Sequence, residues 1–177
     1  MKKLLPLVLV LILSSCSKEV PSEKLVERGG LKYEVNSETP FTGTVVNYYP
    51  SGQVSNSRQY EDGLSVGKYV VYYPNGNIQR KGSFRKVPED FYPLVKVIFD
   101  GINEEYYENG QLRYASMWEN GYVSFDKEFH KNGYLKVERN YLDGLLEDGV
   151  VVSYNDSGDK HKEETYLDGD VVVTKYI

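Results

Sequence analysis

One short motif recurs along this chain, and it constrains the fold more than any other feature. The fullest copy is Tyr-Tyr-Pro-Asn-Gly at residues 72–76. Related pentapeptides occupy residues 48–52, 106–110, 129–133 and 154–158, so their closing glycines are 24, 34, 23 and 25 residues apart. Periods of 20–50 residues are typical of arrays in which each unit packs mainly against its neighbours. The chain is therefore predicted to be a repeat protein with about five units.

Each unit has a second half with its own turn. An aromatic residue stands eight positions beyond each closing glycine: Tyr60, Phe84, Trp118, Tyr141 and Tyr166. Four of these five are followed by Asp-Gly or Asn-Gly, a strong signal for a short hairpin turn. Pro-Asn-Gly is also turn chemistry, because proline presets φ and glycine accepts a positive φ. The segments between the turns are rich in Tyr, Val, Phe and Thr, which favour strands. Each unit is predicted to be a β-hairpin, and the fold all-β.

Alternation along the strands predicts which side chains share a face. Residues two apart in a strand point to the same side. On this basis the first aromatic of each pair, such as Tyr48, and the aromatics eight residues beyond the glycines line one apolar face. The second aromatics, Tyr49, Tyr73 and Tyr107, then point to the other, wetter face. Tyrosine is a favoured interface residue, so these three are the candidate partner-binding residues.

The amino terminus carries a targeting signal. Lys2 and Lys3 precede an apolar run over residues 4–13, which has the length of a signal-peptide core and is too short to span a bilayer. The following residues 13–16, Leu-Ser-Ser-Cys, resemble the bacterial lipobox. That resemblance implies cleavage before Cys16, lipid attachment to Cys16, and a bacterial envelope location. Ser17 next to the cysteine implies sorting to the outer membrane.

Three regions follow from this organisation. Residues 1–15 are predicted to be a lipoprotein signal peptide, residues 16–24 a lipidated tether, and residues 25–177 the repeat domain. Within the domain, residues 31–35 and 170–177 are predicted to be its first and last strands. The second unit is about ten residues longer than the others, which predicts a loop insertion near residues 85–96.

The motifs as a set resemble a known repeat family. The Phe-Thr-Gly entry at 41–43, the Tyr-Tyr-Pro-Asn-Gly hairpin and the Tyr-x-Asp-Gly exits are similar to the bacterial variant of MORN repeats, found in proteins named as antitoxins of the YwqK family. The resemblance covers roughly residues 31–177. It implies stacked antiparallel hairpins in an elongated, curved, single-layer sheet. It implies no established activity.

Composition narrows the function. The net charge is −5, and removal of residues 1–15 would make it −7, which disfavours nucleic acid as a partner. His130 and His161 have no second ligand at zinc spacing, and no pair of carboxylates stands out for acid–base work. We therefore expect no cofactor, no metal and no catalytic residue.

Two hypotheses of different classes remain. The first is a non-enzymatic envelope lipoprotein, bound to the membrane through Cys16, whose hairpin sheet binds another protein or an envelope polymer. The alternative is an antitoxin-like or immunity-like protein that neutralises a toxin or effector. A hydrolase acting on glycans across a tyrosine-rich groove is a third, weaker hypothesis.

Overall fold

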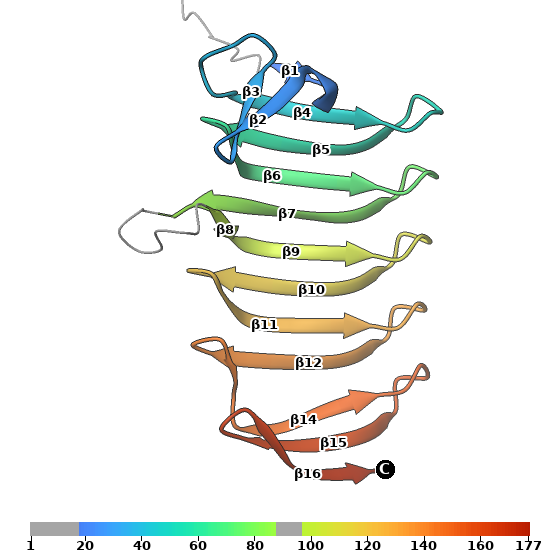
Figure 1. The fold of residues 1–177 in the computed structure, drawn as a ribbon. Coiled ribbons are helices and arrows are strands. Elements are labelled where there is room, and N and C mark those ends of the chain that lie inside the picture. The colour runs from blue at the N-terminus through green and yellow to red at the C-terminus, as the bar shows by residue number, and fades with distance from the viewer. Residues whose placement is uncertain (1–17, 88–96) are drawn as a thin grey trace, which may run out of the picture.

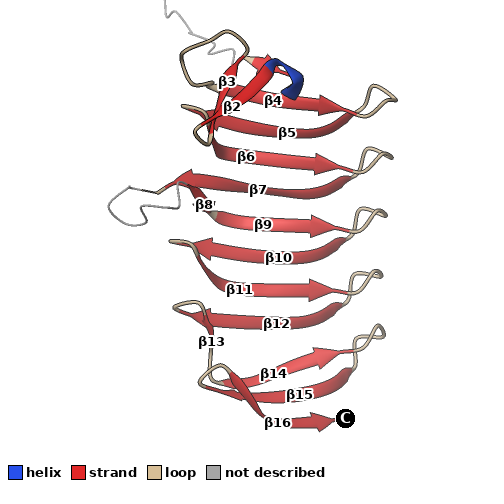
Figure 2. Ribbon diagram, viewed as in Figure 1, coloured by secondary structure: helices blue, strands red, loops and turns tan. Residues whose placement is uncertain are grey.

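The turns and strands of the repeats assemble into one long sheet. The computed structural model of the protein describes residues 18–87 and 97–177. Its strands lie one beneath the next in an elongated single-layer sheet of 14 strands, and they curve where they approach the Asn-Gly turns (Figure 1). Strands account for nearly all of the regular structure (Figure 2). The prediction of an all-β fold built from antiparallel hairpins is confirmed.

Five hairpins form the body of the sheet, and each pairs with the next in chain order. They are β4 (Gly43–Tyr48) with β5 (Val54–Glu61), β6 (Leu64–Tyr72) with β7 (Ile78–Lys86), β9 (Gly101–Tyr106) with β10 (Leu112–Glu119), β11 (Tyr122–Phe129) with β12 (Leu135–Leu142), and β14 (Gly149–Tyr154) with β15 (Lys160–Leu167). Strand β16 (Asp170–Tyr176) closes the order, as predicted. The short β13 (Leu145–Leu146) pairs with β12.

The Asx-Gly turns connect a returning strand to the strand that follows it in the chain: β5 to β6, β10 to β11, β12 to β13 and β15 to β16. Asp62, Asn120, Asp143 and Asp168 have φ between 49° and 52°, and the glycine after each has φ between 79° and 84°. Two consecutive residues with positive φ define the hairpin turn whose twist matches that of its strands. Aspartate and asparagine tolerate this conformation better than other side chains, and glycine adopts it without a steric penalty.

A β-bulge recurs in every returning strand. In β5, Val54 pairs with Tyr48 while Asn56 pairs with Asn47, which leaves Ser55 unpaired. The same shift leaves one residue unpaired in each of the other four hairpins, always three residues beyond the closing glycine: Gln79, Arg113, Lys136 and His161. A bulge of this kind reverses the in–out alternation of the residues that follow it.

The bulges overturn the predicted arrangement of faces. Val54 shares a face with its partner Tyr48, but Tyr60, on the far side of the bulge, points to the opposite face. The aromatics eight residues beyond the glycines therefore do not lie on the same face as the first aromatics of the pairs. We call the face that carries Tyr48, Tyr72, Tyr106 and Phe129 the ladder face. The opposite face, which carries Tyr60, Tyr69, Asn103 and Asp126, is the cleft face.

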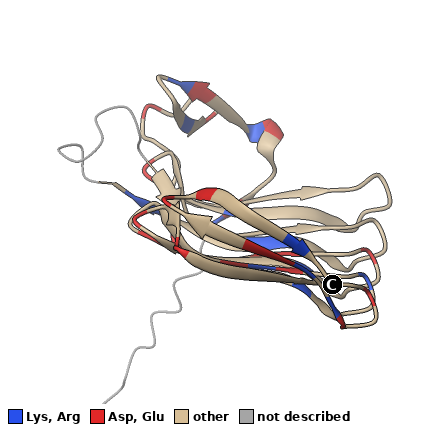
Figure 3. Cartoon of the chain, turned by 90° about the horizontal axis from the view of Figure 1, so that it is seen from below, with Lys and Arg blue, Asp and Glu red and all other residues tan. Residues whose placement is uncertain are grey.

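A small second layer covers one end of the cleft face. Strand β1 (Glu19–Val20) pairs parallel to β4, a 3₁₀ turn η1 (Ser22–Lys24) follows, and β2 (Leu25–Arg28) pairs with β3 (Leu31–Glu34). Figure 3 shows this two-stranded sheet standing over one side of the large sheet. Val20, Phe41 and Val45 are buried beneath it, with Leu25 and Tyr60 packed against them.

Two predictions about residues 16–35 have different outcomes. The strand predicted at residues 31–35 is confirmed as β3. The predicted tether at residues 16–24 differs from the structure, because Val20 is only 7% exposed and belongs to the core. Burial of the Val20 side chain in an apolar core is favoured by the hydrophobic effect over exposure in a flexible tether.

The described residues on the two sides of the insertion near residues 85–96 belong to paired strands. Arg85 and Lys86 continue β7, and β8 (Val97–Phe99) pairs back along it. The rest of the predicted loop, residues 88–96, lies outside the described residues. Phe84 stacks on Phe99, with ring centroids 4.7 Å apart, so both ends of the insertion are fixed to the cleft face.

Candidate binding surfaces

The three tyrosines predicted to bind a partner connect neighbouring hairpins. Each is half-buried, and its hydroxyl donates to a backbone carbonyl of the next hairpin. The Tyr49 hydroxyl lies 2.5 Å from the oxygen of Tyr72, that of Tyr73 lies 2.9 Å from Tyr106, and that of Tyr107 lies 2.8 Å from Phe129. These bonds give the row a structural role in stacking the repeats. Its role in binding a partner stays a prediction.

The asparagines of the turn motif form a second row of links. Asn75, Asn109 and Asn132 each donate through the side-chain amide to a carbonyl in the next turn: those of Glu108, Lys131 and Asp156, respectively. Their side-chain oxygens accept the backbone N–H two residues on, which closes their own turns. Sequence reasoning identified these asparagines as turn formers and missed their contact with the next repeat.

The ladder face carries a row of apolar side chains, most of them half-buried. The aromatic that ends one strand stands opposite an aliphatic side chain at the start of the return strand in four consecutive hairpins: Tyr48 with Val54, Tyr72 with Ile78, Tyr106 with Leu112, and Phe129 with Leu135. Tyr48 is 57% exposed, and Ile102 on the same face is 54% exposed. The small second layer of the described chain lies on the other side of the sheet (Figure 3).

Paired charges border this apolar surface. Lys81 lies 2.8 Å from Glu104, and Lys127 lies 3.2 Å from Glu138. The hydrogen bond to Glu104 raises the pKa of Lys81 above its usual value, so the lysine stays charged at neutral pH. Protein-binding surfaces typically have an apolar centre surrounded by a polar rim, and this arrangement of an apolar strip beside paired charges resembles them.

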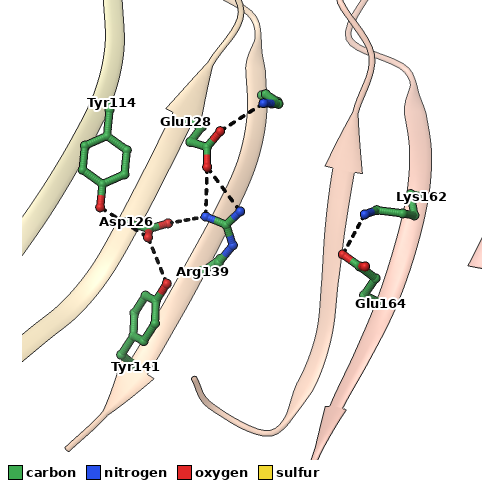
Figure 4. A network of polar contacts seen from close by, with 8 residues as sticks. Tyr114, Asp126, Glu128, Arg139, Tyr141, Lys162 and Glu164 are labelled. Carbon is green, nitrogen blue, oxygen red and sulfur yellow. Dashed lines mark hydrogen bonds and ion pairs between the residues drawn. The ribbon is translucent and has the colours of Figure 1, made fainter. Parts of the chain in front are cut away.

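On the cleft face, a polar network is centred on Asp126 (Figure 4). Its carboxylate accepts hydrogen bonds from the hydroxyls of Tyr141, at 2.9 Å, and Tyr114, at 3.4 Å, and pairs with Arg139 at 3.0 Å. Arg139 also pairs with Glu128, at 3.2 Å. The network links β10, β11 and β12 through Asp126, and this residue is only 6% exposed.

The network also shifts proton affinities. Burial, followed by the neighbouring charge of Asp126, raises the pKa of Tyr114. Burial and the hydrogen bond to Asp126 raise the pKa of Tyr141 to about 12. Both hydroxyls therefore stay protonated as donors, which satisfies the buried carboxylate and argues for a structural role. Sequence reasoning missed this network because its members come from three strands.

Two further observations concern chemistry and membranes. Within residues 18–87 and 97–177, no group of three or more His, Cys, Asp or Glu side chains is placed to hold a metal ion. In the same part of the chain, no helix has the length and apolar character needed to cross a membrane. Cys16, the predicted lipidation site, lies outside the described residues.

Comparison with known proteins identifies the repeat. The family described as MORN repeat variant matches three segments, residues 41–62, 65–86 and 99–120. These correspond to the hairpins β4–β5, β6–β7 and β9–β10 with their flanking turns. A search of curated proteins found no match to the chain. The structure and the family match agree that the three hairpins within residues 41–120 are repeats of the MORN type.

Proposed function

We propose that this chain is a non-enzymatic, lipid-anchored protein of the bacterial envelope whose repeat sheet binds another protein or an envelope component through the ladder face. The observation that carries the proposal is the row of aromatic–aliphatic pairs repeated over four hairpins, on a face that no described part of the chain covers. Soluble proteins rarely leave apolar rows of this extent facing water unless something binds there.

The geometry of the row suits an extended partner surface. The hairpins place one pair after another at the spacing of sheet strands, so contacts add along the length of the molecule. Large aromatic side chains contribute disproportionately to binding, because they bury much area with few rotatable bonds. MORN-type repeats on an open sheet are compatible with such a binding role.

The binding half of the proposal is tested with Leu112→Asp, which places a charge at the centre of the ladder face. The full-length protein, purified from envelope fractions after crosslinking, should lose its co-purifying molecules in this variant. Ser51→Asp adds the same charge at an exposed turn and should keep them. Circular dichroism checks that both variants fold. Equal recovery from the two variants would contradict the assignment of the ladder face. A toxin or effector among the molecules lost would indicate neutralisation.

The anchoring half is tested with Cys16→Ala. A bacterial lipoprotein carries several acyl chains on this cysteine, and their combined burial holds the protein on the bilayer. The variant should move from the membrane pellet to the soluble fraction, while Ser17→Ala should stay in the pellet. Retention of the Cys16→Ala protein in membranes after a high-salt wash would refute lipid anchoring.

A further inference from the structure

A cleft lies between the small second layer and the cleft face. Leu25 and Lys32 of the two-stranded sheet form one wall, and Val45, Arg58, Tyr69 and Arg80 belong to the other. Its volume is about 390 Å³. This is within the range of sites that hold small molecules, roughly 300–1,000 Å³. The cleft lies where β2 and β3 pass over the large sheet (Figure 3).

The charge of this cleft is opposite to that of the protein. The chain has 26 acidic and 21 basic side chains, yet the residues that line the cleft include Lys32, Arg58 and Arg80 and no aspartate or glutamate. The hollow next along the same face shares Arg80 with the cleft and also includes Glu105, the residue opposite Arg80 in the register. Lys32 pairs with Glu27 at 3.0 Å, so the positive charge available to an anion comes from Arg58 and Arg80. A positive cleft in an acidic molecule attracts anions.

The charges of Arg58 and Arg80 are available to a ligand. Within the described residues, no ion pair joins Arg58 or Arg80 to a carboxylate, although 15 ion pairs are made elsewhere. The Arg58 guanidinium lies over the rings of Tyr69 and Phe84, at 5.7 and 5.6 Å from their centroids. A guanidinium that stacks on aromatic rings can still bind an oxyanion, because its N–H groups lie in the plane of the group.

Both arginines flank Tyr69 on the cleft face. Tyr69 belongs to β6, and Arg58 and Arg80 come from β5 and β7 on either side of it. The register pairs Arg58 directly with Tyr69 and places Arg80 opposite Val71. Burial, the largest effect, and the charge of Glu105 raise the pKa of Tyr69, whereas Arg80 and Arg58 lower it. The adjoining wall is apolar, with Val45, Val71 and Tyr60.

We propose that this cleft binds a small organic anion, with its carboxylate or phosphate between Arg58 and Arg80 and its apolar part against Val45, Val71 and Tyr60. Guanidinium groups recognise both oxyanions through paired N–H donors. The cleft lies on the opposite face from the ladder, so the two proposals can fail separately.

The test titrates the folded protein with each of four probes and detects binding by nuclear magnetic resonance. N-acetyl-leucine supplies a carboxylate with an apolar side chain, and N-acetyl-leucinamide is its neutral counterpart. Phenyl phosphate and inorganic phosphate form the second matched pair. We expect saturable shifts at the amides of Val45, Arg58 and Tyr69 with N-acetyl-leucine, phenyl phosphate or both, and none with N-acetyl-leucinamide. Inorganic phosphate should bind more weakly than phenyl phosphate.

Variants decide whether the arginines are responsible. Arg58→Gln and Arg80→Gln should each weaken the binding of the better organic anion by about tenfold or more, since each removes a charge-assisted hydrogen bond. Lys136→Gln removes the same charge outside the cleft, where the lysine pairs with Glu128, and should leave the affinity unchanged. Equal binding of the neutral amide, unchanged affinity in both arginine variants, or no saturable shift with either organic anion would overturn the proposal.

Discussion

Replacing Trp118 with alanine is expected to lower the free energy of unfolding by roughly 3 kcal/mol, near the low end for a large core aromatic because the ring is only partly buried. Trp118 ends a column of four rings on the cleft face, formed by Tyr69, Phe84, Phe99 and Trp118. Successive centroids are 5.2, 4.7 and 5.2 Å apart. The column ties two repeats together across the insertion, so truncation at Trp118 removes ring contacts and opens a void beside Phe99.

Urea denaturation of the full domain measures this effect, with Tyr48→Ala as the control. Tyr48 is an aromatic in the same kind of repeat, but it is 57% exposed on the ladder face, and its loss should cost much less. Equal losses of stability in the two variants would show that the ladder face is packed as tightly as the ring column. That result would also count against the ladder face as a free binding surface.

The hairpins could be predicted from sequence because local chemistry determines them. Asp62-Gly63 and its counterparts require positive φ at two consecutive positions, and few other residue pairs tolerate that. The repeat period then places each hairpin beside the next, since consecutive antiparallel strands pair with short connections. Even the last strand, β16, was predictable from the turn before it and from its run of three β-branched valines.

The faces could not be predicted, because one unpaired residue per hairpin changes the parity. Ser55, Gln79, Arg113, Lys136 and His161 share a position and a polar side chain, but no residue type. Polar residues are common at any exposed strand position, so this similarity does not mark a bulge in the sequence. Counting every second residue across the bulge put Tyr60 and Tyr48 on one face, whereas the register puts them on opposite faces.

The candidate sites depend on contacts between side chains of different strands, which explains why they were missed. Lys32 and Arg80 meet at one cleft only because β2 and β3 fold back over the large sheet. Asp126 and Arg139 lie 13 positions apart, and their pairing follows from the register of β11 against β12. A sequence signal did exist for the second pair: an acid and an arginine at matching positions of consecutive strands.

Gly82→Ala is the second substitution from which a large loss is expected, roughly 2–4 kcal/mol. Gly82 lies between Tyr69 and Asn103 on the cleft face, and the Tyr69 hydroxyl reaches across it to the Asn103 side-chain oxygen at 3.2 Å. A Cβ atom at position 82 would come within 1.8 Å of that oxygen and 3.0 Å of the Tyr69 ring. The buried amide would have to move, and the hydrogen bond between two buried side chains would break.

A double-mutant cycle with Asn103→Ala isolates this clash. Asn103→Ala alone should cost about 1–2 kcal/mol, because the Tyr69 hydroxyl loses its partner. In that background the closest obstacle to a methyl group at position 82 is gone, so adding Gly82→Ala should cost less than about 1 kcal/mol. Replacing a strand glycine with alanine also recovers about 0.5–1 kcal/mol of chain entropy. The cycle therefore predicts strongly non-additive losses of unfolding free energy, measured in urea. Additive losses would mean that Gly82 is required by its own backbone and that the Tyr69–Asn103 contact does not determine its identity.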